Sequence, residues 1–176
     1  MLRFHAVSVL LAGCAASNQG GVGAAGKEEE TATVGTPGLE LSTTRYDDSG
    51  DPERELVREG GAIYVEWTSD AGNSELFVQV LLSLRASGCE QEAHGEASLQ
   101  NELRGLDARV PLRLYCTDGA ATMTAGLVGR VPADQYDGLF AEPSWLRVVF
   151  ETGAGVPADV DLEVMPTPDG CPNRSE

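Results

Sequence analysis

The chain has few of the side chains that most enzymes use for proton transfer and nucleophilic attack. Its 176 residues include one lysine, Lys27, and two histidines, His5 and His94. Lys27 lies in a glycine-rich stretch, which excludes a Schiff-base lysine or a Ser-Lys dyad from the folded part. The Gly-x-Ser-x-Gly, Gly-x-x-x-x-Gly-Lys, His-Glu-x-x-His and dinucleotide-binding motifs are also missing. We therefore predict a protein that is not an enzyme and uses no cofactor.

Positive charge is scarce as well. Lysine and arginine total 12 against 28 aspartates and glutamates, which gives a net charge of −16. Binding to nucleic acid needs clustered basic residues, so the charge balance argues against a nucleic-acid partner. It equally argues against electrostatic docking on anionic lipid. The negative charge mainly favours solubility and can attract cations or basic partners.

No apolar run is long enough to span a membrane. Residues 6–13 are uncharged and mostly apolar, but as a helix they would rise only about 12 Å, against a hydrocarbon core of roughly 30 Å. Arg3 is the only charge that precedes them. This arrangement is typical of the hydrophobic region of a signal peptide.

The apolar run ends in Leu11-Ala12-Gly13-Cys14, which resembles the lipobox of bacterial lipoproteins. The resemblance implies that residues 1–13 are a signal peptide and that Cys14 becomes the lipidated first residue of the mature chain. Its acyl chains would hold the protein on a membrane, since each buried methylene contributes about 0.8 kcal/mol. Ala15 resembles the residue that follows the cysteine in lipoproteins sorted to the outer membrane. We therefore expect a protein of the bacterial cell envelope, anchored by lipid to the outer membrane.

The segment after the cysteine is predicted to be a flexible tether over residues 14–38. Between Ala15 and Gly38 there are six glycines and no aromatic residue, leucine, isoleucine or methionine. Such a stretch cannot bury enough apolar surface to offset the entropy lost on ordering. A tether of this kind would let a folded domain stand clear of the bilayer.

Alternation of apolar and polar residues begins after the tether and predicts many short strands, each with one buried face. The expected inward residues are Ile63, Val65 and Trp67; Leu76, Val78, Val80, Leu82 and Leu84; Val110, Leu112, Leu114 and Cys116; Leu146, Val148 and Phe150; and Val160, Leu162 and Val164, with Met123, Ala125 and Leu127 fitting less cleanly. Turn signals rich in Asp, Asn and Gly separate these runs.

We interpret the pattern as a mainly β fold, an antiparallel β-sandwich of about seven to eight strands over residues 39–166. Residues 90–106 depart from the alternation, because Leu99, Leu103 and Leu106 have helical spacing. We expect one short helix or an irregular crossover there. Residues 167–176 are predicted to form a loose tail.

With Cys14 assigned to lipid attachment, Cys89, Cys116 and Cys171 remain, an odd number in a compartment that permits disulfides. We favour a Cys89–Cys116 bridge, because one residue follows a predicted strand and the other ends one. A bridge between Cys171 and the body of the domain is the alternative. Zinc is not expected, since there is no Cys-x-x-Cys pair.

The candidate ligand-binding features are few. Asp47, Asp48, Asp51 and Glu53 crowd one turn and could offer oxygen ligands to calcium, although the spacing is not that of an EF-hand. Trp145, Tyr64 and Tyr136 could contribute an exposed aromatic platform, whereas Trp67 falls on an apolar face and is expected in the core.

We therefore expect a binding or scaffolding domain whose partner is an envelope protein or a glycan. Two alternatives stay open. One is an adhesion module that depends on calcium or carbohydrate. The other is a small envelope hydrolase that uses His94 or a pair of carboxylates.

Overall fold

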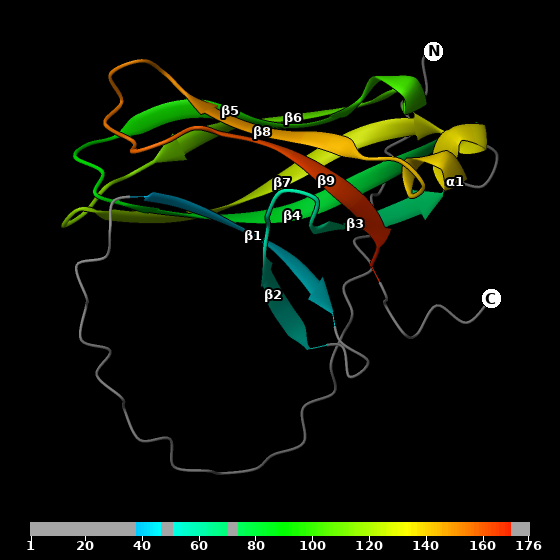
Figure 1. The fold of residues 1–176 in the computed structure, drawn as a ribbon, viewed down its shortest axis with the longest axis horizontal. Coiled ribbons are helices and arrows are strands. Elements are labelled where there is room, and N and C mark those ends of the chain that lie inside the picture. Colours follow the sequence, from blue (N-terminus) through cyan, green and yellow to red (C-terminus); the bar gives the residue numbers. More distant parts are fainter. Residues whose placement is uncertain (1–37, 47–50, 70–73, 170–176) are drawn as a thin grey trace, which may run out of the picture. The chain divides into compact units, whose positions relative to one another are not determined.

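The computed structural model describes residues 38–46, 51–69 and 74–169, all within the second of the chain's two units, Ala32–Glu176. Nine strands make up most of this part of the chain (Figure 1). They are β1 (Gly38–Tyr46), β2 (Pro52–Leu56), β3 (Ala62–Ser69), β4 (Glu75–Ser87), β5 (Ala93–Asn101), β6 (Leu106–Leu114), β7 (Ala120–Pro132), β8 (Ser144–Phe150) and β9 (Val160–Pro168). Short helical turns lie at η1 (Glu102–Arg104), η2 (Ala133–Gln135) and α1 (Tyr136–Leu139).

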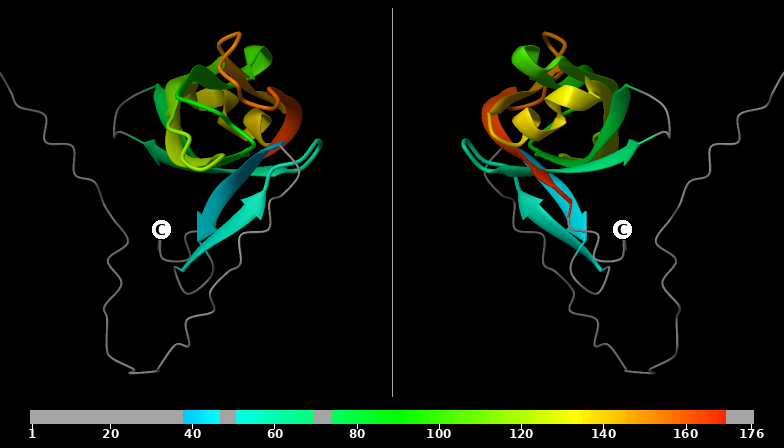
Figure 2. Two further views of the ribbon diagram at one scale, coloured as in Figure 1. Left: turned by 90° about the vertical axis from the view of Figure 1, so that its left-hand side faces the viewer. Right: turned by 90° about the vertical axis from the view of Figure 1, so that its right-hand side faces the viewer.

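The long strand β4 organises the sheet because three strands pair with it. One of its edges pairs along its whole length with β7, from Glu75 opposite Pro132 to Ser87 opposite Ala120. The other edge is divided. Its C-terminal half pairs with β1, and its N-terminal half pairs with β3. Beyond β4 the strands β1 and β3 therefore separate, and β1 continues into a hairpin with β2 that extends away from the other strands (Figure 2).

A parallel ladder between β3 and β9 joins this group to the remaining strands. From β9 the sheet continues through β8 and β5 to β6, with every pair antiparallel. The prediction of a mainly β fold is confirmed. The prediction of an antiparallel sandwich is not confirmed, because the nine strands form one curled, mixed sheet that resembles half of a barrel. Alternation reveals which face of a strand is buried, but it does not reveal which strand lies beside it.

Most of the expected inward residues lie in the core between the curled parts of the sheet. Ile63, Val65, Leu82, Leu114, Leu127, Leu146, Val148 and Val164 are fully buried, and Trp67 packs against the core while staying partly exposed. Burial at alternate positions is clearest in β8. There Ser144, Leu146, Val148 and Phe150 are buried, and the three residues between them are exposed. The predictions of strand faces are thus confirmed.

Residues 90–106, expected to form one short helix or an irregular crossover, contain no α-helix and only the three-residue 3-10 turn η1. This stretch forms β5, the turn η1 and the start of β6, so its three leucines belong to three different elements. Leu99 faces the core from β5, Leu103 is exposed on η1, and Leu106 begins β6. Gly105 allows the tight connection by adopting a left-handed φ of 73°. The one α-helix in the described residues lies at Tyr136–Leu139 instead.

The limits of the strand region also differ slightly from the predicted 39–166. The first strand begins at Gly38, and β9 runs to Pro168, so residues 167 and 168 of the expected tail are part of the sheet. In the described part of the chain, no helix has the length and apolar character that crossing a membrane would require.

The structure brings Cys89 and Cys116 to disulfide distance, with their Cα atoms 5.9 Å apart. Cys89 lies in the connection from β4 to β5, and Cys116 lies in the connection from β6 to β7. Both connections run between the pair β4 and β7 and the pair β5 and β6, so the bridge ties these two pairs of strands together at one end. Cys171, the alternative partner, lies outside the described residues.

The strands β6 and β7 approach closely without a hydrogen-bonded ladder. Gly129 on β7 makes this possible, because a Cβ atom there would lie 2.7 Å from Leu106 Cδ1 and 3.1 Å from Ala108 Cβ. Gly126, three residues earlier on β7, has open space, with Gln79 Nε2 the nearest atom at 3.7 Å. The glycine at position 129 is therefore required by packing rather than by backbone conformation.

We predict that Gly129→Ala lowers the free energy of unfolding by about 1–3 kcal/mol through overpacking. Gly126→Ala is the matched control and should leave stability unchanged or raise it by about 0.5 kcal/mol. Urea denaturation of both variants provides the measurement. Equal stability of the two would contradict the close approach of β6 and β7.

Candidate functional site

A groove of about 700 Å³ lies where η1 faces the start of β8. Side chains from the end of β5, the turn η1, the start of β8 and the start of β9 line it: Gln100, Asn101, Glu102, Leu103, Glu142, Pro143, Trp145, Arg147 and Asp161. The register of the strands brings these side chains together, since Trp145 of β8 lies opposite Gln100 of β5 on one side and opposite Glu163 of β9 on the other. The groove thus has one wall from the turn η1, a second wall from Glu142 and Pro143 just before β8, and a floor from the outer face of the sheet.

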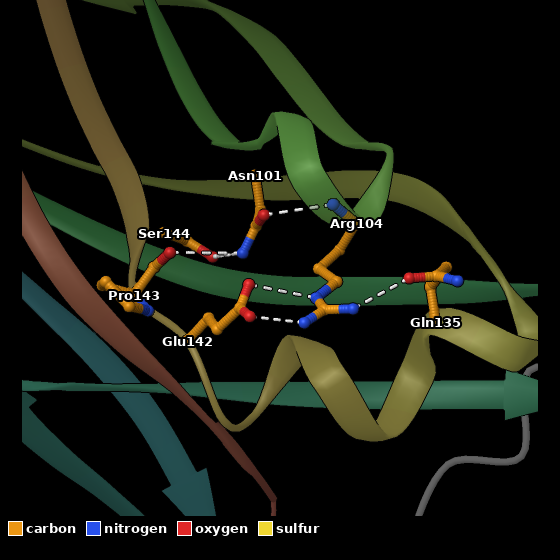
Figure 3. Close-up of polar contacts among 6 residues, drawn as sticks. All are labelled: Asn101, Arg104, Gln135, Glu142, Pro143 and Ser144. Carbon is orange, nitrogen blue, oxygen red and sulfur yellow. Dashed lines mark hydrogen bonds and ion pairs between the residues drawn. The ribbon is translucent and has the colours of Figure 1, made fainter.

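Asn101 holds the two walls of this groove together (Figure 3). Its side-chain oxygen accepts a hydrogen bond of 3.2 Å from the backbone N–H of Arg104, which caps η1. Its Nδ2 donates to the backbone oxygen of Pro143 at 3.2 Å and to Ser144 Oγ at 3.3 Å. Asn101 and Ser144 are both buried, so these bonds are shielded from competing water.

Arg104 makes a second connection across the same walls (Figure 3). Its guanidinium forms two parallel bonds with the carboxylate of Glu142, one of them from Nε at 3.1 Å, and its Nη1 donates to Gln135 Oε1 at 3.0 Å. The guanidinium also packs against Gly138 of α1, where a Cβ would lie 2.5 Å from Arg104 Cζ. Bidentate pairing of this kind fixes orientation as well as distance.

The surface of the groove combines exposed apolar groups with oriented charges. Trp145 is 51% exposed and Leu103 is 81% exposed. Beside Trp145, Arg147 Nη2 donates to Asp161 Oδ2 at 2.8 Å. The hydrogen bond and charge of Asp161 raise the pKa of Arg147 above its usual range, so the guanidinium stays charged.

Three carboxylates line the groove, those of Glu102, Glu142 and Asp161. The carboxylates of Glu142 and Asp161 are each paired with an arginine, and none of the lining residues is a serine, cysteine, lysine or histidine. His94, the candidate base of the hydrolase alternative, lies outside the groove on the exposed face of β5. There its Nε2 is 3.0 Å from Glu92 Oε1.

The other residues singled out in the sequence do not converge on one site. Cys14, Asp47 and Asp48 lie outside the described residues. Glu53 pairs with Arg45 at 2.7 Å. No group of three or more His, Cys, Asp or Glu residues arranged for a metal exists within the ranges that the structure describes.

The candidate aromatic residues likewise lie apart. Tyr64 donates its hydroxyl to Glu55 Oε2 at 3.0 Å, away from the groove. Trp67 and Tyr136 pack against each other edge to face, with ring centroids 5.2 Å apart. Only Trp145, among the aromatic candidates, lies in the groove.

Sequence reasoning missed Asn101, Arg104 and Glu142. The signal for the first two was the run Asn101-Glu-Leu-Arg-Gly105, in which an asparagine caps a short turn that ends at a left-handed glycine. Helical spacing of the nearby leucines hid that signal. Glu142 had no comparable signal, because its partner Arg104 is 38 residues away in the chain.

No protein-family model matches this chain, and no curated protein sequence matches it.

We predict that Asn101→Ala lowers the free energy of unfolding by about 1–3 kcal/mol, because it leaves buried partners without hydrogen bonds. The exchange of the Arg104 amide hydrogen should also become faster, since its acceptor is lost. Gln100→Ala, which removes a neighbouring amide bonded to the exposed Asp107, is the control and should cost less than about 0.5 kcal/mol. Unchanged exchange at Arg104 would show that Asn101 does not hold the turn.

Proposed function

We propose that the chain is a lipid-anchored protein of the bacterial cell envelope whose β domain binds a ligand at the Trp145 groove. Support for the anchor comes from the lipobox-like residues that end at Cys14 and from the glycine-rich stretch that follows them. Support for binding comes from the groove itself, whose exposed indole is the single observation on which the proposal rests.

A saccharide is the ligand class that best fits the chemistry of the groove. One face of a sugar ring presents C–H groups that pack on an aromatic ring, and its hydroxyls both donate and accept hydrogen bonds. The groove offers the Trp145 indole together with the amide of Gln100 and the Arg147–Asp161 pair, which supply donors and acceptors side by side. Because Asn101 and Arg104 hold the walls in place, a ligand would meet a site that needs little ordering.

A protein partner is the second candidate, and the exposure of Leu103 is the observation that favours it. Tryptophan and arginine are enriched among residues that dominate protein–protein binding energy, and an exposed leucine beside them would be buried in such a contact. The two candidates differ in their dependence on Leu103, which projects from η1 rather than from the sheet.

The anchoring proposal predicts that Cys14→Ala moves the protein from the membrane pellet to the soluble fraction of a bacterial expression host. Incorporation of an alkyne-labelled fatty acid should be lost at the same time, since the thiol is the acceptor of the lipid. Cys171→Ala is the matched control and should stay labelled and membrane-bound. A Cys14→Ala protein that still sediments with membranes would contradict the anchor.

The binding proposal predicts that Trp145→Ala reduces saccharide binding on a glycan array at least tenfold, whereas Leu103→Ala changes it less than threefold. Both residues are exposed, so the fold and melting temperature should be preserved. If Leu103→Ala has the larger effect on capture of an envelope protein, the protein-partner candidate is favoured. Absence of any saccharide that depends on Trp145 would contradict the saccharide proposal.

A further inference from the structure

A second hollow, of about 720 Å³, lies on the outer face of the strands β2, β1, β4 and β7. Cross-strand registration places its polar side chains in neighbouring rows. Ser42, Ser83 and Thr124 form one row, because Ser42 is opposite Ser83 and Ser83 is opposite Thr124. Glu40, Arg85 and Thr122 form the next row by the same registers. The floor of the hollow therefore presents hydroxyl groups from three adjacent strands.

Two arginines that form no ion pair with any other described residue line this hollow. Among the nine arginines of the described residues, six form ion pairs within 4.0 Å: Arg45, Arg104, Arg109, Arg113, Arg130 and Arg147. Arg54, Arg58 and Arg85 form none there, and two of these three, Arg54 and Arg85, belong to the hollow.

Unpaired guanidinium groups are unexpected on a surface of this charge. The chain has 28 acidic residues against 12 basic ones, so an acidic neighbour is easy to find for most arginines. Arg85 even lies opposite Glu40 in the β1–β4 register, yet no ion pair forms between them. The guanidinium groups of Arg54 and Arg85 thus remain available to an external anion, with the hydroxyls of Ser42, Ser83, Thr122 and Thr124 nearby.

The two arginines enter the hollow from different strands. Arg54 comes from β2 and lies opposite Thr44, two rows away from Arg85 on β4. Two strand spacings and two rows separate their Cα atoms by roughly 15 Å along the sheet. A ligand that contacts both arginines must be extended. It must carry a negative group near each end, so that each group can pair with one arginine. Single small anions would engage only one of them.

We propose that this hollow binds a short acidic saccharide, whose carboxylates pair with Arg54 and Arg85 and whose hydroxyls bond to the serines and threonines between them. Charge complementarity selects an acidic ligand, and the hydroxyl floor selects one that is rich in hydroxyl groups. Glu40 lies at the same face and repels one of the carboxylates, which limits the affinity. The site is separate from the Trp145 groove, and the proposal does not depend on it.

The test is isothermal titration of the full mature protein with a galacturonic acid trimer, compared with its fully methyl-esterified form. The ester has the same ring shape and no negative charge, so it should bind at least tenfold more weakly. Arg54→Gln and Arg85→Gln should each weaken binding of the acid trimer at least fivefold. Arg130→Gln, on the same outer face of β7 but paired with Glu75, is the matched control and should change it less than twofold.

Glu40→Gln provides the opposite readout and should strengthen binding of the acid trimer two- to fivefold, because a repulsive charge is removed. Rising salt concentration should weaken binding of the acid trimer and leave binding of the ester unchanged. Equal binding of acid and ester, or loss of binding in Trp145→Ala rather than in the arginine variants, would overturn the proposal. No binding of the acid trimer at millimolar concentration would overturn it as well.

Discussion

The divided edge of β4 is the constraint on which the rest of the structure depends. A strand has two hydrogen-bonding edges, and β4 gives one of them entirely to β7 and shares the other between β1 and β3. Since β1 and β3 cannot continue side by side beyond β4, the sheet must separate there. The branch through β3 meets β9 in a parallel ladder and curls over the core, whereas the branch through β1 ends in the hairpin with β2. Burial of the residues between the curled parts stabilises this arrangement, because removal of apolar side chains from water is the main driving force of folding.

Both proposed binding sites follow from that geometry. The hollow with Arg54 and Arg85 exists because the β1–β2 hairpin extends from one half of β4 while β7 continues along its other edge. The Trp145 groove forms on the other branch, where β8 begins beside the β5–β6 turn. Its shape depends on side chains far apart in the chain, since Asn101 and Arg104 bond to Pro143, Ser144 and Glu142. Rigid walls and an exposed aromatic ring are features of a site that is formed before its ligand arrives.

The sequence indicated which face of each strand is buried, but it did not indicate which strands lie side by side in the sheet. Period-two alternation identified the buried sides of β3, β4 and β8, because burial acts on each strand separately and leaves its mark in consecutive residues. The parallel β3–β9 pair left no such mark, since register and partner are set by long-range contacts. Leu99, Leu103 and Leu106 gave a helical period by coincidence, and the stronger local signal was the Asn101 cap with Gly105. Trp145 could be placed on a partly exposed face from the sequence, whereas the Arg104–Glu142 pair beside it could not, because 38 residues separate its members.

The most direct test is nuclear magnetic resonance of the isotope-labelled protein, titrated with soluble saccharides released from purified bacterial envelopes. We expect the indole N–H of Trp145 and the amides of Gln100 and Arg147 to shift together with saturating dependence on concentration, while the resonance of the Trp67 indole stays unchanged. Shifts that avoid Trp145, or a spectrum that no envelope saccharide perturbs, would contradict the claim that this domain binds its ligand at the groove.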